Sequence, residues 1–316
     1  MQKINREDIQ IISRHSNWSE DGVSKALRDN VYSDLPSLQK FLKLLFLSVG
    51  VSFALAGIVF FFAYNWEALH KSIKLGLMEG LVVLTTLAAV IIKTKPLLKK
   101  LLLTAAAILV GVLYAVFGQV YQTGANAYDF FLGWTIFISL WVLISNFAPL
   151  WTIYIALINA TVLLYAEQVA HGWSEMFVYA LLFIINALFL VSFLWLPKLL
   201  GKTFFPVWFT NFLALAAVLF GTIGMVNGIF DKPENYFIVL LFSVLCAYAL
   251  GFWYGLATRR SFYPAIVSFS VIIIISAFLL DISEDAAMLL IVGLFIVTCV
   301  TLLILFLINL HKKWTN

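Results

Sequence analysis

Long apolar runs, one after another, constrain this chain more than any other feature. Residues 286–309, for example, contain no charged side chain. A helix needs about 20 mainly apolar residues to cross the roughly 30 Å hydrocarbon core of a bilayer. Only helices and closed barrels satisfy all of their backbone hydrogen bonds in that core, and unbroken apolar runs exclude the barrel. The run therefore predicts a transmembrane helix.

Nine further runs of this kind predict an all-α, polytopic membrane bundle with about ten transmembrane helices. The predicted spans are residues 43–63, 75–92, 101–121, 130–146, 149–166, 173–196, 204–227, 236–256, 262–280 and 286–309. Hydrophobic residues make up 63% of the chain and charged residues 11%, which is far from the composition of soluble domains. The connection before Pro149 is so short that a tight turn between two spans and a re-entrant pair both fit.

The basic residues fall mainly on one side of this arrangement. Seventeen of the 20 Lys and Arg residues lie on the side of both termini, and only Lys71, Lys74 and Lys232 lie on the other. By the positive-inside rule, this bias predicts a multi-pass membrane protein with both termini in the cytoplasm. The net charge of +4 follows from this topology and indicates no nucleic-acid partner.

The first forty residues are polar and predict a small cytoplasmic pair of amphipathic helices. Ile9 and Ile12 share one helical face, and Ser19 before two acidic residues is typical of a second helix start. The pair could pack on itself, lie on the membrane surface, or dock a cytoplasmic protein partner through residues 1–34. The expected organisation is this hairpin at 1–40, a membrane half at 41–148 and further membrane helices at 149–316.

One acidic residue, Glu79, lies inside a predicted span. An unpaired charge there costs several kcal/mol, so the carboxyl group must be protonated, paired or in contact with water. Gly76 and Gly80 flank it with the spacing that allows another helix to approach closely. A pair with Lys74, a protonated hydrogen bond between helices, and a proton- or cation-binding site all fit.

A polar segment interrupts the apolar sequence at residues 117–134, FGQVYQTGANAYDFFLGW. Gly111, Gly118 and Gln122 fall on one helical stripe that ends at its outer rim. The tryptophan and tyrosines also suit interfacial anchors, and Asp129 also suits a helix cap. With FFAYNWE at residues 61–67, the segment predicts an outward-facing polar pocket that binds a small ligand or lipid headgroup. The candidate pocket residues are Asn65, Trp66, Glu67, Glu79, Gln119, Tyr121, Gln122, Asn126, Asp129 and Trp134.

These two segments carry a resemblance to a known family. FFAYNWE and FGQVYQTGANAYDFFLGW, together with the N-terminal hairpin, resemble the bacterial predicted membrane proteins of domain of unknown function 2157, over roughly residues 1–148. The residues that correspond to the recurrent pattern of this family are Asn65, Trp66, Gln119, Tyr121, Asp129 and Trp134. The resemblance implies a prokaryotic inner-membrane protein and brings no activity, cofactor or substrate.

Motifs for catalysis are scarce, so neither a cofactor nor a metal is predicted. His70 and His171 have acidic neighbours in sequence but no identifiable third ligand, and Cys246 and Cys299 read as buried small apolar residues. A non-catalytic sensor, scaffold or ligand-binding module fits best. The alternative is a secondary transporter resembling the five-plus-five-helix drug/metabolite transporters and proton-coupled through Glu79. An enzyme that acts on lipid, with Glu79 or Asp129 as base, is a third class.

Overall fold

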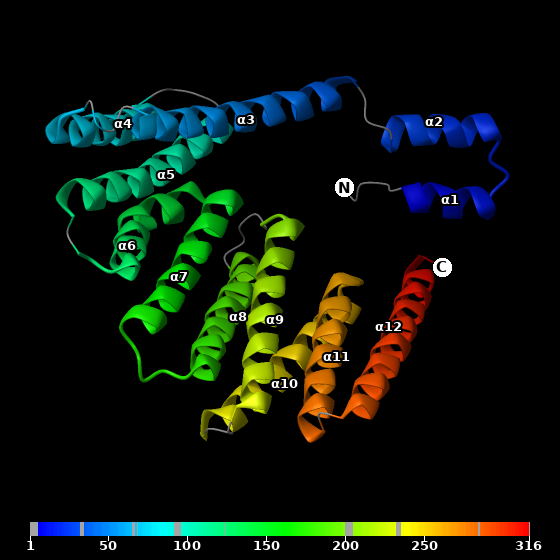
Figure 1. Ribbon diagram of the computed structural model, residues 1–316. Coiled ribbons are helices and arrows are strands. Elements are labelled where there is room, and N and C mark those ends of the chain that lie inside the picture. The colour runs from blue at the N-terminus through cyan, green and yellow to red at the C-terminus, as the bar shows by residue number, and fades with distance from the viewer. Residues whose placement is uncertain are drawn as a thin grey trace. The chain divides into compact units, whose positions relative to one another are not determined.

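Helices account for every element in the described part of the chain. A computed structural model describes residues 6–31, 35–64, 67, 69–91, 96–122, 124–199, 205–231, 235–283 and 285–315. The helices are α1 Arg6–Arg14, α2 Glu20–Asn30, α3 Leu35–Tyr64, α4 Lys71–Ile91, α5 Pro96–Tyr121, α6 Ala127–Ser145, α7 Ala148–Gln168, α8 Glu175–Leu199, α9 Val207–Phe230, α10 Asn235–Ala257, α11 Phe262–Ile282 and α12 Ala286–Thr315 (Figure 1). Ten of them, α3 to α12, are long and apolar enough to cross a membrane. The predicted fold class is confirmed.

Several helices extend past the apolar runs that predicted them. The first span was expected at residues 43–63, whereas α3 begins at Leu35; the last was expected at 286–309, whereas α12 ends at Thr315. Each of these helices has 30 residues, which corresponds to about 45 Å, longer than the hydrocarbon core. The apolar run corresponds to the part of the helix that crosses the hydrocarbon core, and the helix continues beyond it into the polar interface.

The short connection before Pro149 is a tight turn between two helices of spanning length. Asn146 ends α6 in the left-handed conformation, with φ 43° and ψ 53°, and Phe147 precedes α7 in an extended one. The ammonium of Lys100, on α5, donates to the carbonyl oxygen of Asn146 at 3.2 Å and lies 5.8 Å from the ring centre of Phe147. A cation therefore satisfies an unpaired carbonyl where α6 ends.

The chain forms two compact units. The first comprises Met1–Trp66 and Ile308–Asn316, and the second comprises Glu67–Leu307. In the first unit α1 and α2 contact each other, Ile9 is buried, and Ser19 caps α2 by accepting from the amide of Gly22 at 3.2 Å. Ile12, expected on the same face as Ile9, is exposed. The start of the second short helix at Ser19 is confirmed.

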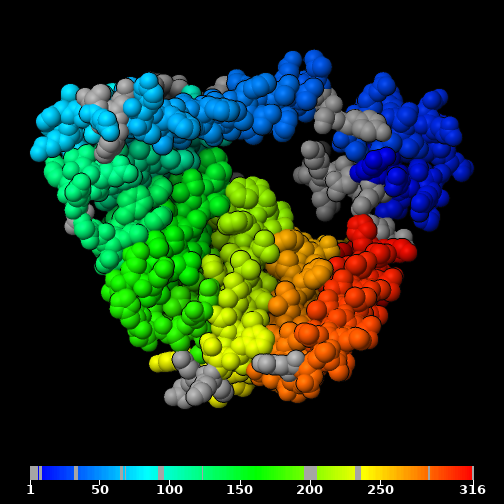
Figure 2. Space-filling model, in the orientation of Figure 1, coloured from blue at the N-terminus to red at the C-terminus, as the bar shows by residue number. Residues whose placement is uncertain are grey.

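In the second unit each helix from α4 to α10 packs on the next helix along the chain, and α11 also packs on α9 (Figure 1). Side chains close the spaces between consecutive helices (Figure 2). The closest packing is between α8 and α9, where glycines face large side chains: an added Cβ at Gly221 would lie 2.9 Å from the ring of Phe183, and one at Gly224 would lie 3.2 Å from Tyr179. Small residues let membrane helices approach closely, and Gly221 and Gly224 allow this approach between α8 and α9.

Polar side chains join α7 to α8 inside the second unit. Asn159 and Asn186 exchange two amide hydrogen bonds, at 3.1 and 2.8 Å, and Asn186 also donates to the carbonyl of Leu182. Asn186 is fully buried. Hydrogen bonds of this kind between helices are typical of asparagines inside membrane spans.

The two cysteines differ from their prediction. Both are free, but Cys246 is exposed on α10 and Cys299 is half-buried on α12. Surfaces that face lipid are as apolar as the protein interior, so hydropathy alone could not distinguish a lipid-facing cysteine from a core cysteine.

Candidate functional site

Most of the described residues predicted to form the outer pocket lie near one end of α4, α5 and α6. Asn65 and Trp66 lie outside the described residues. Since α5 packs against both α4 and α6, the start of α4, the end of α5 and the start of α6 lie at one end of this three-helix group. We call the following exposed residues there the polar end: Glu67, Gln119, Tyr121, Gln122, Asn126 and Asp129.

The connection from α5 to α6 shapes the polar end. Gln122 and Gly124 both adopt positive φ, 45° and 61°, and the conformation costs glycine little but costs other residues roughly 1–2 kcal/mol. Asn126 is the N-cap of α6 but makes no side-chain cap bond; instead, the amide of Tyr128 donates to the side chain of Gln168, on α7, at 3.1 Å. Gln168 thus caps α6, a role that sequence reasoning missed.

Trp134 lies between α5 and α6. Its indole N–H donates to the carbonyl oxygen of Ala107 at 2.7 Å, and its ring covers Gly111, where an added Cβ would lie 2.5 Å away. In return, the ring of Tyr114 covers Gly133, where an added Cβ would lie 2.8 Å from the ring. At Gly111, therefore, the ring of Trp134 fills the predicted groove. At Gly118 no described atom lies within 4 Å of an added Cβ.

Glu79 is exposed on α4, two turns from the polar end. Lys74 is buried, with 8% of its surface exposed, and residues five apart on an α-helix point about 140° away from each other. A Cβ at Gly76 or Gly80 would meet no described atom within 4 Å. In the second unit, then, the predicted close helix approach is not found at these glycines, and Glu79 lies on an open face of α4.

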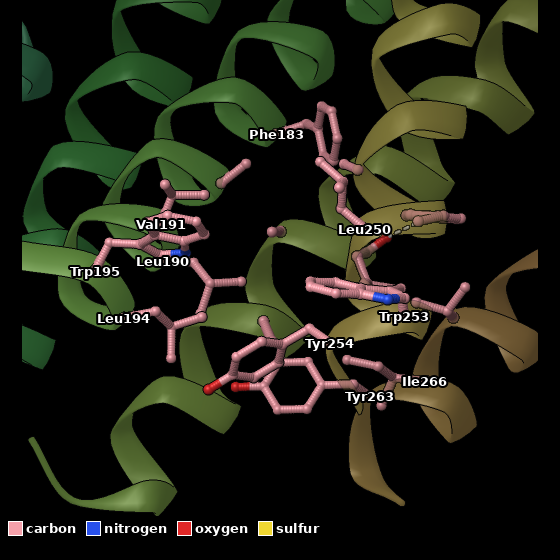
Figure 3. Close-up of a pocket in the computed structure, with 18 residues that line it drawn as sticks. Phe183, Leu190, Val191, Leu194, Trp195, Leu250, Trp253, Tyr254, Tyr263 and Ile266 are labelled. Carbon is pink, nitrogen blue, oxygen red and sulfur yellow. Dashed lines mark hydrogen bonds between the residues drawn. The ribbon is translucent and has the colours of Figure 1, made fainter. Parts of the chain in front are cut away.

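A separate cavity lies between α8 and α10, with α9 and α11 behind it. We call it the α8–α10 groove; its volume is about 260 Å³. Leu190 and Trp195 of α8 face Trp253 of α10 across it (Figure 3). Ala217 of α9 and Val267 of α11, both buried, form its floor. Sequence reasoning did not identify this groove.

The outer rim of the groove is apolar and open. Val191, Trp195, Leu250 and Trp253 line the groove and are also 53%, 58%, 65% and 63% exposed. On membrane-spanning helices, exposed apolar side chains contact lipid. The groove therefore opens at the side of the helices, through a rim whose composition suits contact with acyl chains.

One end of the groove is closed by a core cluster. Phe183 and Tyr248 pack there with Val244 and Leu240. Three hydroxyl groups bond to one another at this end. Ser270 Oγ lies 2.6 Å from both Tyr248 Oη and Thr222 Oγ1, and the last two oxygens are 3.4 Å apart. These hydroxyls satisfy one another's hydrogen bonding, so none of the three needs a hydrogen bond from a ligand at the closed end.

Two tyrosines line the opposite end of the groove, next to the connection that holds Arg259 and Arg260. The rings of Tyr254 and Tyr263 lie together there, with centres 5.2 Å apart (Figure 3). Tyr263 is 2% exposed, and its hydroxyl oxygen makes no hydrogen bond among the described residues. The side chains of Thr210 and Arg260 are close enough to act on it. Arg259 is exposed beside Arg260 in the connection from α10 to α11.

A close contact between α10 and α11 positions this end. Gly255 is buried, and a Cβ there would collide with the ring of Pro264 and lie 3.0 Å from the carbonyl oxygen of Arg260. Arg259 adopts φ 54°, and the amide of Arg260 donates to the carbonyl of Gly255 at 2.8 Å. The close contact at Gly255 therefore holds Arg260 next to Tyr254 and Tyr263.

The described residues contain no group of three or more His, Cys, Asp or Glu side chains arranged to hold a metal ion. No curated protein and no solved structure matches the chain. A family model does match: residues 18–151 agree with it, which confirms the resemblance carried by the FFAYNWE and FGQVYQTGANAYDFFLGW segments. Over residues 18–151, which include α2 to α6 and the polar end, this multi-pass membrane chain is therefore similar to the family described as predicted membrane protein (DUF2157).

Proposed function

We propose that this protein is a non-catalytic membrane module that binds a lipophilic ligand in the α8–α10 groove. The supporting observation is the open rim: a cavity of about 260 Å³ whose lining side chains at Val191 and Leu250 are also exposed on membrane-spanning helices. An apolar ligand reaches such a site from the bilayer without passing through water. Burying its apolar surface on binding also supplies favourable packing contacts.

The proposed setting is a bacterial inner membrane with both termini in the cytoplasm. The support comes from the distribution of charge, because seventeen of the 20 Lys and Arg residues lie on the side of the termini. In this setting α1 and α2 form a cytoplasmic hairpin, and we propose that residues 1–34 dock a protein partner that senses the membrane module.

Labelling with an uncharged photoreactive probe tests the ligand-binding proposal. A long-chain alcohol that carries a diazirine is added to vesicles holding the full-length protein, and labelled peptides are identified by mass spectrometry. Peptides of α8 and α10 around Trp195 and Trp253 are expected to be labelled several times more than the exposed face of α12. Equal labelling of these helices would contradict the proposal.

A matched pair of variants sharpens this test. Gly251 lines the groove, and a Cβ there meets only Val267, at 3.8 Å, so Gly251→Leu should fill the groove without a collision. Gly293, on α12, is exposed and has nothing within 4 Å among the described residues. Gly251→Leu is expected to lower groove labelling several-fold, whereas Gly293→Leu should leave it unchanged.

The polar end is a second candidate surface. Its support is the packing of α5 between α4 and α6, which brings Glu67, Gln122 and Asp129 to one end of the helices. We propose that this end faces outward and contacts a small polar ligand or lipid headgroup, as residues 61–67 and 117–134 predict.

A further inference from the structure

We propose that the ligand of the α8–α10 groove is an anionic phospholipid of the cytoplasmic leaflet. One acyl chain lies in the groove, and the headgroup phosphate lies against Arg259, Arg260 and the hydroxyl of Tyr263. This inference rests on the proposed function and adds the class of ligand, its orientation and the leaflet that supplies it.

The depth of the groove determines the leaflet. It is lined by the second half of α8, up to Trp195, and of α10, up to Tyr254, and by the first turns of α11 from Tyr263. The connection between α10 and α11 holds Arg259 and Arg260. Tryptophans concentrate where acyl chains meet headgroups, and Trp195 and Trp253 lie at this level. The positive-inside rule assigns that side to the cytoplasm.

The charge at this end calls for an anion. Residues 176–230 and 236–280, which cover most of α8 to α11, contain no Asp or Glu. Arg259 and Arg260 therefore have no carboxylate within these stretches of the four helices that form the groove. Arginine guanidinium groups suit phosphate because they present several N–H donors in a planar arrangement. A zwitterionic headgroup carries a positive charge of its own, which these arginines repel.

An unpaired hydroxyl supports the same position for the headgroup. A buried hydroxyl without a partner is costly, and such groups in native proteins call for an explanation. Tyr263 Oη is buried without a hydrogen bond among the described residues, at the end of the groove where the side chains of Thr210 and Arg260 are close to it. A phosphate or ester oxygen of a lipid held by Arg260 would accept a hydrogen bond from the Tyr263 hydroxyl. At the closed end, by contrast, Tyr248, Thr222 and Ser270 bond to one another and leave an apolar end for the acyl chain.

The test compares two phospholipids that share one diazirine-bearing acyl chain, one with a phosphatidylglycerol headgroup and one with a phosphatidylcholine headgroup. Each is mixed at the same low fraction into phosphatidylcholine vesicles that contain the full-length protein. Groove labelling by the anionic lipid is expected to exceed that by the zwitterionic lipid, by about fivefold for each arginine that contacts the headgroup. Raising the salt concentration should reduce the difference.

Three variants assign the preference to this site. Arg259→Gln with Arg260→Gln should bring the two lipids to similar labelling, whereas Lys312→Gln with Lys313→Gln, a matched change on α12, should leave the preference intact. Tyr263→Phe removes a single oxygen and should lower the preference about two- to threefold, as expected for one hydrogen bond of modest net strength. This conservative variant keeps the test valid if the double arginine variant does not fold.

The outcomes separate the two proposals. Equal groove labelling by both lipids, or a preference that survives the arginine change, overturns the anionic phospholipid and leaves the lipophilic-ligand proposal standing. Absence of groove labelling by either lipid and by the uncharged alcohol overturns both.

Discussion

The indole of Trp134 covers Gly111, and each helix of this pair offers a glycine to an aromatic ring of the other. A methyl group added at Gly111 would lie 2.5 Å from the indole. Gly111→Ala is therefore expected to lower the free energy of unfolding by about 1–3 kcal/mol, the usual cost of overpacking. Gly118→Ala, with nothing described within 4 Å, serves as the control. Thermal unfolding of both variants in detergent measures the difference, and equal stability would rule out this contact.

The amide pair of Asn159 and Asn186 predicts an energetic coupling between α7 and α8. Two reciprocal hydrogen bonds join the side chains, and hydrogen bonds between membrane helices average about 0.6 kcal/mol in double-mutant cycles. Asn159→Ala and Asn186→Ala should therefore destabilise less together than the sum of the single changes, by about 1 kcal/mol. Unfolding measurements on the four proteins of the cycle test this. Strict additivity would mean that the pair does not act as a unit.

The turn between α6 and α7 predicts a backbone effect at Asn146. Its φ of 43° lies in the left-handed region, where β-branched residues are strongly disfavoured. Asn146→Gly should be neutral or slightly stabilising, whereas Asn146→Val should cost roughly 1–2 kcal/mol. Chemical denaturation in mild detergent compares the two variants. If valine is tolerated as well as glycine, the turn has a different conformation.

Glu79 tests the transport alternative. Since Glu79 lies far in sequence from the groove and on an open face of α4, Glu79→Gln is expected to leave groove labelling unchanged. A proton-coupled transporter would instead lose pH-dependent solute flux in vesicles on this change, with its fold intact. Flux of that kind in the original protein, abolished by Glu79→Gln, would favour the transporter over the binding module.

The polar end can be tested by cross-linking. Glu67→Cys and Gln122→Cys are introduced together after Cys246 and Cys299 have been replaced by serine. Because α4 and α5 pack side by side with these residues at one end, a short bis-maleimide is expected to join the two cysteines. A control with cysteines at Glu67 and Asn146 should not react, since Asn146 lies beside Lys100 near the opposite end of α5. Failure of the first pair to react would argue against a shared polar end.

The number and approximate position of the spans could be predicted from sequence because hydrocarbon imposes a minimum apolar length on each helix. The helix start at Ser19 followed from local capping rules in the same way, whereas the sequence left open whether the connection at Asn146 joins two spans or a re-entrant pair. These features depend on residues that are close in sequence.

The groove could not be predicted in this way. Its lining is composed of the same Leu, Val, Ala and Trp residues that fill every span, and it exists because α8 and α10 pack together at Phe183 and Tyr248 but separate near Trp195 and Trp253. The two arginines were noted for topology, but the hydroxyl without a partner at Tyr263 appears only in three dimensions.

The role of Trp134 was missed for a related reason. A tryptophan that anchors the chain at the membrane interface cannot be distinguished in the sequence from one whose ring packs on a glycine. The distinction lies in the facing residue, Gly111, which belongs to another helix.

The open rim at Val191 and Leu250 has a consequence for how any occupant is measured. A molecule that enters sideways exchanges with a two-dimensional solvent, so its occupancy follows its mole fraction in the leaflet and not its concentration in the buffer. Diluting the vesicles in buffer leaves that fraction unchanged, whereas diluting the bilayer with a competing lipid lowers it. Titrations of this site should therefore be made in lipid composition.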